Sequence, residues 1–229
     1  MTGIDHISRY LIAVFLFAGL NTLHAQQKDF QYWTSAQAEL GVWGNLDILA
    51  EEEIRFRENC SQLDRQINDL GISYRFNKYL KTSLYYRLSA NWKNPGYHEW
   101  RQGFYADLSL RYGTGRFRFG YRARFQSARI DLNRNEDRFF NEAVDRHKVT
   151  IEYNIQSLPL SPFVEGELFF LMQNRQNNLS DYRAWIGMTY ALGKMHKFSL
   201  KYGIDRELME SDPLTSYIIA LNYTLNLKL

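Results

Sequence analysis

The chain has 229 residues, a formal net charge of +3 and a single cysteine. So small a charge gives no basic surface of the kind that binds nucleic acid, and one cysteine cannot form an internal disulfide. Aromatic residues are abundant, with 16 Tyr, 15 Phe and 5 Trp, although 23% of the residues are charged. This combination is typical of alternating strands whose aromatic side chains form girdles at the two surfaces of a membrane.

The first residues have the order of a secretory signal peptide. Arg9 precedes an apolar run over 10–20, and Ala25 offers a cleavage point. The run is too short to span a bilayer, so an N-terminal membrane anchor is the less favoured alternative. We therefore predict a signal peptide over 1–25 and one mature domain over 26–229. A helical inner-membrane protein is excluded, because the mature sequence contains no second long apolar segment.

Apolar and polar residues alternate along most of the mature chain, which predicts strands rather than helices. Phe117, Phe119 and Tyr121 alternate with arginines, whereas an apolar helix face would need a spacing near 3.6 residues. The runs are long enough for tilted strands that cross a bilayer of about 30 Å. In chain order, the predicted strands cover 30–43, 46–58, 65–77, 79–92, 98–112, 116–126, 147–156, 162–174, 180–192, 196–208 and 215–229.

The connections between these runs alternate in length. The short ones are 76–78, 113–115, 157–161 and 193–195. The mostly longer, polar ones are 58–64, 93–97, 127–142, 173–179 and 209–214. Such an asymmetry is typical of an outer-membrane barrel whose short turns face the periplasm. The run at 215–229 has one apolar face, and in a closed barrel such a last strand would pair with the first and leave no open edge.

We predict an all-β fold: a single antiparallel, up-and-down transmembrane β-barrel of ten to twelve strands. The number is open, because the pattern gives eleven runs while an outer-membrane barrel with both ends in the periplasm needs an even number. Either 30–43 is not a full membrane strand or one crossing is missing. A soluble lipocalin-like barrel or sandwich is disfavoured, because its interior could not hold so many charges.

Glu52 is an exception to the pattern. Strict alternation from Ile48 to Ile54 would point this carboxylate at lipid, where a charge near the bilayer midplane is costly. We therefore expect a bulge or an interfacial depth at Glu52.

If the apolar faces meet lipid, the charged faces line the lumen, where basic side chains outnumber acidic ones. A positive field in a low-dielectric tube would favour anions. The candidate anion path consists of Arg116, Arg118, Arg122, Arg124, Arg55 and Arg87. Its candidate acidic partners are Glu51, Glu53, Asp107, Glu152, Glu165 and Glu167. An equally open alternative is that these groups form cross-strand ion pairs that fill a narrow barrel.

An outer-membrane lipid-modifying enzyme is the least favoured alternative. Such chemistry needs a nucleophile and a base within hydrogen-bond reach, and the same-face neighbours of His147 are Asp145 and Val149 rather than Ser or Thr. An interfacial His147 that faces lipid headgroups is the simpler interpretation. We predict no catalytic residue, no metal site, no cofactor and no nucleic-acid partner.

Short motifs follow one another along nearly the whole mature chain. They include Trp33, Glu53-Ile54-Arg55, Phe119-Gly120-Tyr121-Arg122, Arg146-His147-Lys148 and Tyr182-Arg183. In this arrangement the chain resembles an uncharacterised outer-membrane β-barrel family, common in Bacteroidetes, that is defined only as a domain of unknown function. The resemblance implies a barrel in the outer membrane of a Gram-negative cell and brings no activity, ligand or catalytic residue. The chain departs from a regular alternation at Glu51-Glu52-Glu53.

Two functions follow from a barrel with a net-basic lumen. The first is a narrow, porin-like pore or transport component for small anionic solutes. The second is a closed structural or partner-binding barrel of the cell envelope, with outer loops, chiefly 127–142, that contact other envelope proteins. In both cases the expected partners are outer-membrane lipids and, during insertion, the barrel-assembly machinery.

Overall fold

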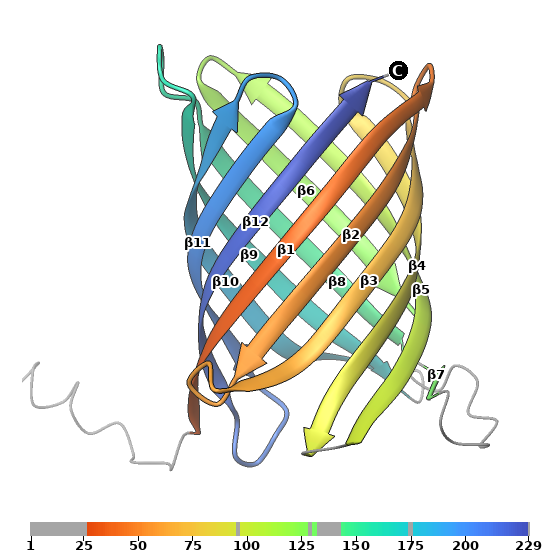
Figure 1. Ribbon diagram of the computed structural model, residues 1–229, viewed down its shortest axis with the longest axis vertical. Helices are drawn as coiled ribbons and strands as arrows, with labels where there is room; N and C mark the ends of the chain where they lie inside the picture. The colour runs from red at the N-terminus through yellow and green to blue at the C-terminus, as the bar shows by residue number, and fades with distance from the viewer. Residues whose placement is uncertain (1–26, 95–96, 128–129, 132–142, 174–175, 229) are drawn as a thin grey trace, which may run out of the picture.

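Eleven long strands form one closed barrel, as Figure 1 shows. The computed structural model describes residues 27–94, 97–127, 130–131, 143–173 and 176–228, so the predicted signal peptide at 1–25 and most of the predicted loop at 127–142 lie outside the described residues. The long strands are β1 (Lys28–Trp43), β2 (Leu46–Arg57), β3 (Gln62–Arg75), β4 (Leu80–Asn94), β5 (Tyr97–Thr114), β6 (Phe117–Gln126), β8 (Ala143–Tyr153), β9 (Leu160–Gln173), β10 (Gln176–Leu192), β11 (His196–Glu207) and β12 (Thr215–Lys228). A two-residue strand, β7 (Ile130–Asp131), pairs with β5.

The barrel closes where β1 meets β12, and this pair is parallel. Lys28 lies opposite Thr215, and Gly41 lies opposite Lys228. The other pairs are antiparallel and join neighbours along the chain. Because the number of long strands is odd, the first and the last run in the same direction, and a parallel closure is the only way to remove both edges. The predicted barrel is confirmed, although its purely antiparallel pairing is wrong at this one seam, and 30–43 belongs to a full strand of 16 residues.

The two ends of the barrel differ in their connections. We call the end that holds the connections around Gly44, Gly115 and Gly193 the turn end, and the opposite one the loop end; β12 finishes at the turn end and β1 starts at the loop end (Figure 1). All three glycines have φ between 55° and 67°, a left-handed backbone that glycine adopts without steric cost. The predicted loops 93–97 and 173–179 are wrong in large part, because β4 reaches Asn94 and β5 starts at Tyr97, while β9 reaches Gln173 and β10 starts at Gln176.

Contacts between strands that are not neighbours identify the inner face. Lys81 on β4 donates to Glu39 on β1 at 2.7 Å, although β2 and β3 separate these strands. Trp33 on β1 and Trp185 on β10 pack edge to face, with ring centroids 5.7 Å apart. Such contacts are possible only through the interior.

The opposite face of the wall is apolar and exposed along most strands. Exposed large side chains include Leu70, Leu108, Ile186 and Leu200. Extensive exposed apolar surface is rare on soluble monomers, so the barrel is consistent with a membrane barrel that meets lipid on its outside.

No helix in the described part of the chain is long and apolar enough to cross a membrane.

Glu52 lies on the outer face near the middle of β2. It pairs regularly with Ala36 on β1 and Asn68 on β3. The irregular pairing between β2 and β3 comes later, at Arg55 and Phe56. The expectation of a bulge at Glu52 is therefore wrong, and the alternative of an interfacial depth stays a prediction.

Candidate functional site

The interior beside β3, β4, β5 and β6 is occupied by two arginine–carboxylate pairs and a tyrosine. Arg87 donates to Asp69 with two nitrogens, at 2.7 and 2.5 Å. Arg124 holds Asp107 in the same forked way, at 2.6 and 2.7 Å. The Tyr105 hydroxyl donates to Asp69 at 2.6 Å. We call these five residues the tyrosine cluster.

The tyrosine cluster is dry and well paired. Tyr105 is only 2% exposed. Its ring stacks on that of Tyr85, with centroids 4.5 Å apart, and the guanidinium carbons of Arg124 and Arg87 lie 3.9 and 4.9 Å from its centre. Forked guanidinium–carboxylate bonds and cation–π contacts both strengthen when water is excluded. The carboxylates of Asp69 and Asp107 therefore already neutralise Arg87 and Arg124 of the predicted anion path.

A second cluster gathers around one carboxylate, Glu167 on β9, with partners on β6, β8 and β10. Glu167 accepts from Arg122 at 2.7 Å and from Arg146 at 3.1 Å. Arg183 lies 4.0 Å from the other Glu167 oxygen and donates to Asp205 at 2.5 Å. We call this set of five residues the Glu167 cluster. It contains three guanidinium groups and two carboxylates, so its formal net charge is positive.

Aromatic rings pack in the interior beside the Glu167 cluster. Trp33 and Trp185 are buried together with Ile218 and Ala220. The guanidinium carbon of Arg55 lies 3.7 Å from the centre of the Trp33 ring, and that of Arg183 lies 4.9 Å from it.

Glycines permit this close packing. Gly203 lies opposite Trp185 in the β10–β11 pairing, and a Cβ at Gly203 would collide with the Trp185 ring. Gly71 is related in the same way to Tyr85. The lumen at this height is thus packed with side chains.

The remaining members of the predicted path lie nearer the ends or beside the clusters. Arg118 pairs with Glu152 and its side chain is 58% exposed near the turn end. Arg116 donates to the Tyr153 hydroxyl at 3.1 Å. Tyr153 packs on the outer-face ring of Phe117, so Arg116 reaches around the rim and does not line the lumen.

The predicted acidic partners also face inward. Glu53 binds Arg55 on its own strand. Glu165 accepts from Lys148 at 3.2 Å and from Thr150 at 3.1 Å. Glu51 lies on the inner face of β2, opposite Asp69 in the β2–β3 pairing.

Five residues of the two clusters are missing from the predicted path and its acidic partners: Asp69, Tyr105, Arg146, Arg183 and Asp205. Asp69 and Tyr105 belong to the tyrosine cluster, and Arg146 belongs to the Glu167 cluster. Asp69 could have been found, because within the predicted strand 65–77 it lies on the same face as Arg65 and Arg75, which is the charged face of that strand. Arg146 was missed because β8 begins at Ala143, before the predicted start of that strand.

A comparison with protein families identifies the group to which this barrel belongs. A family model described as "Protein of unknown function (DUF2490)" matches residues 30–211. The chain belongs to the DUF2490 family. The match runs from β1 through β11 and contains every residue of both clusters. The expected membership of a family of unknown function is confirmed. A search of curated proteins found no match to the chain.

On the outer wall of this DUF2490 barrel, His147 has partners at both ring nitrogens. Nδ1 lies 2.7 Å from the Tyr121 hydroxyl, and Nε2 lies 3.0 Å from Asp145. The Phe170 ring packs against the imidazole at 5.7 Å. Neither hydrogen-bond partner is Ser or Thr, and the arrangement holds the imidazole on the outer face near the loop end.

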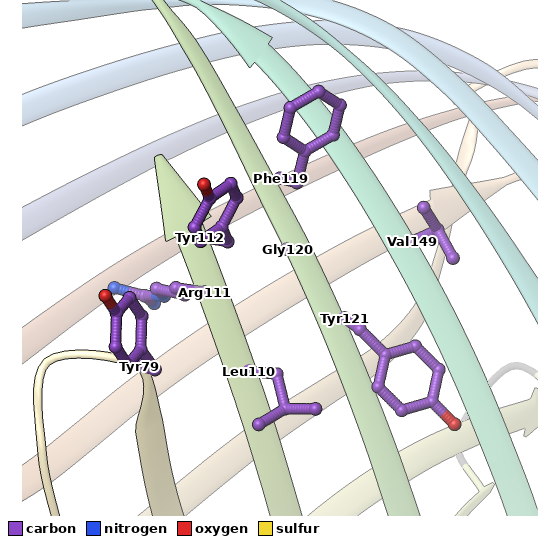
Figure 2. A pocket seen from close by; sticks show the side chains of 8 residues that line it. All are labelled: Tyr79, Leu110, Arg111, Tyr112, Phe119, Gly120, Tyr121 and Val149. Atoms are coloured by element: carbon purple, nitrogen blue, oxygen red, sulfur yellow. The ribbon is translucent and has the colours of Figure 1, made fainter. Parts of the chain in front are cut away.

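A shallow groove marks the turn end of the same outer wall. Figure 2 shows Tyr112 on β5, Phe119 and Tyr121 on β6, and Val149 on β8 around it. The groove has a volume of about 600 Å³ and is lined almost entirely by apolar atoms. Tyrosines at this level suit the boundary between acyl chains and headgroups. The groove of the DUF2490 barrel is consistent with the aromatic girdle of a membrane barrel.

Proposed function

We propose that the protein is an outer-membrane barrel whose lumen is sealed by its own ion pairs. It serves the cell envelope as a rigid structural or partner-binding element and not as an open pore. The observation that carries this proposal is the tyrosine cluster, in which Arg124 and Asp107 are both nearly inaccessible to water.

The energetics of the interior support a seal. A solute crossing the lumen would have to separate forked ion pairs, and removing one partner of a buried pair costs about 3–5 kcal/mol. Trp33 and Trp185 pack across the remaining space. The two clusters and the tryptophans together connect β1 with strands on the far side of the barrel, which makes the wall rigid.

Several features support the outer membrane as the compartment. The inward charges and outward apolar side chains are those of a transmembrane barrel, in which every backbone group is paired within the sheet. The turn end has the tight glycine connections expected of a periplasmic side. Export would depend on the signal peptide predicted at 1–25.

Conductance in planar lipid bilayers tests the seal. We expect the wild-type protein to give no current steps above the baseline of an empty bilayer. The double variant Asp107→Ala/Arg124→Ala removes both charges together and should open a conducting path. The matched control, Arg118→Ala/Glu152→Ala, removes an ion pair near the turn end and should stay silent. Steady anion-preferring channels from the wild-type protein would contradict the proposal.

A narrow anion pore is the second candidate, and one observation favours it. The Glu167 cluster has more guanidinium groups than carboxylates, and Arg118 is exposed nearby towards the turn end. If the wild-type protein does conduct, Arg118→Glu and Arg122→Glu should lower its anion preference. Unchanged selectivity in both variants would dismiss this path.

A further inference from the structure

The outer wall carries one charge where lipid is expected. Among the residues that the structure describes, Glu52 is the only Asp, Glu, Lys or Arg that faces outward away from both ends of its strand. On β2 it lies between Leu46, beside Tyr74 of the turn end, and Phe56, which packs on Tyr32 towards the loop end. Outer aromatics therefore flank Glu52 above and below, and it lies near mid-height.

The surroundings of Glu52 are also unlike the rest of the outer wall. Gln66 donates to Glu52 at 2.6 Å, and the Asn68 side chain is exposed beside it. Towards β1 and the turn end, the outward side chains around these polar groups are small: Thr34, Ala36 and Ala38 on β1 and Ala50 on β2. Larger apolar side chains border the patch elsewhere, namely Ile54 on β2, Leu70 on β3 and Leu88 on β4.

Lipid is a poor neighbour for this patch. Acyl chains offer no hydrogen-bond donor at mid-height, and a carboxyl group exposed there is unfavourable. Small residues next to polar ones are the features that let two membrane segments approach closely and form hydrogen bonds across an interface. The patch therefore has the chemistry of a protein contact.

We propose that the outer face of β1, β2 and β3 around Glu52 is the interface of a symmetric dimer of this protein within the membrane. A twofold interface brings the same patch of both copies together, so the patch must complement itself. It does: Glu52 is an acceptor, and the Gln66 and Asn68 amides are donors. Each Glu52 would accept from an amide of the second copy, which also covers the alanines.

The inference requires that the barrel lies in a membrane, as proposed above, but it does not depend on whether the lumen is sealed. Insertion is therefore measured first, by quenching of tryptophan fluorescence with brominated lipids. Without quenching, the membrane placement fails. With quenching, the oligomeric state alone decides the present inference.

Cysteine crosslinking in lipid vesicles tests the interface. In a Cys60→Ser background, Ala50→Cys places a thiol within the patch and Ala106→Cys places one on the outer face of β5. Both are exposed alanines on the outer wall, so the two variants are matched. A short bifunctional thiol reagent should yield dimer from Ala50→Cys and not from Ala106→Cys. Equal yields, or no dimer from either, overturn the proposal.

Substitution of the carboxylate tests the hydrogen bonds. Glu52→Leu should raise the dimer dissociation constant in vesicles about tenfold, which corresponds to about 1.4 kcal/mol. Glu52→Gln keeps an acceptor oxygen and should retain most of the affinity. Single-molecule photobleaching in vesicles of phosphatidylethanolamine and phosphatidylglycerol counts the copies. A wild-type protein that stays monomeric at high density in the vesicles means that the patch takes a different partner, and rejects the dimer.

Discussion

The carboxylates of the lumen and the carboxylate on the outer wall differ in their partners and in their exposure. Inside, Asp69 and Asp107 are each held by a guanidinium from a neighbouring strand. Outside, Glu52 accepts one bond from a neutral amide and remains exposed. Both arrangements come from the same alternating pattern, which sorts side chains by face and does not supply partners. The barrel pairs Asp69 and Asp107 with guanidinium groups of the same chain, whereas Glu52 has one neutral partner there. This difference is the ground on which a second copy is proposed beside Glu52.

The largest effect is expected in the lumen. Asp69→Ala would leave Arg87 buried without its carboxylate and take an acceptor from Tyr105, so the free energy of unfolding should fall by about 3–5 kcal/mol. Urea unfolding in lipid vesicles measures it. The paired variant Asp69→Ala/Arg87→Ala should recover part of the loss. A change below about 1 kcal/mol for the single variant would mean that water reaches the tyrosine cluster.

A new charge on the apolar part of the outer wall should come next. Ala106→Arg places a guanidinium on β5, where Phe104 and Leu108 flank it on the same face. Near the bilayer midplane this should lower the free energy of unfolding by about 2–4 kcal/mol. The matched control is Ala106→Leu, which should be neutral or stabilising. Equal stability of the two variants would show that this wall does not face lipid.

Removal of the existing outer charge should act in the opposite direction. In protein diluted until it is monomeric, Glu52→Leu should raise the free energy of unfolding by less than about 2 kcal/mol, because a lipid-facing carboxyl group costs less than a basic one. Unfolding in vesicles at a low ratio of protein to lipid provides the measurement. Destabilisation under these conditions would indicate that the bond from Gln66 stabilises the isolated barrel.

The smallest effect is expected at the exposed pair near the turn end. Glu152→Ala removes the partner of Arg118, whose side chain is 58% exposed. Ion pairs in contact with water contribute about 0–1 kcal/mol, so the midpoint of urea unfolding should move little. A loss of unfolding free energy as large as that of Asp69→Ala would mean that the exposed pair near the turn end stabilises the barrel as much as the buried tyrosine cluster does.

The fold followed from sequence to a large extent because alternation records which face of a strand is apolar. That pattern correctly assigned Arg87, Arg122 and Arg124 to the inner face. It could not identify their partners, because partners depend on the register between strands, and a single-strand pattern carries no register. Arg87 meets Asp69 only through the β3–β4 pairing.

Two other features were outside the reach of the pattern for different reasons. The parallel closure depends on the parity of the strand number, which is a property of the whole chain. Glu52 is a charged residue on the face of β2 that the alternation predicts to be apolar, and the sequence alone suggested a local distortion there. The regular pairing of Glu52 with Ala36 and Asn68 instead shows an ordinary strand that carries an unusual side chain.

The parallel pairing of β1 with β12 has a topological consequence. In a barrel that spans the outer membrane, as proposed, a peptide tag fused ahead of Lys28 and one fused behind Lys228 would emerge on opposite sides of the bilayer, so antibodies added to intact cells would reach only one of them. Parallel ladders are also slightly weaker per residue than antiparallel ones. The β1–β12 ladder offsets this weakness by its length, because it joins 14 residue pairs where the β5–β6 ladder joins ten.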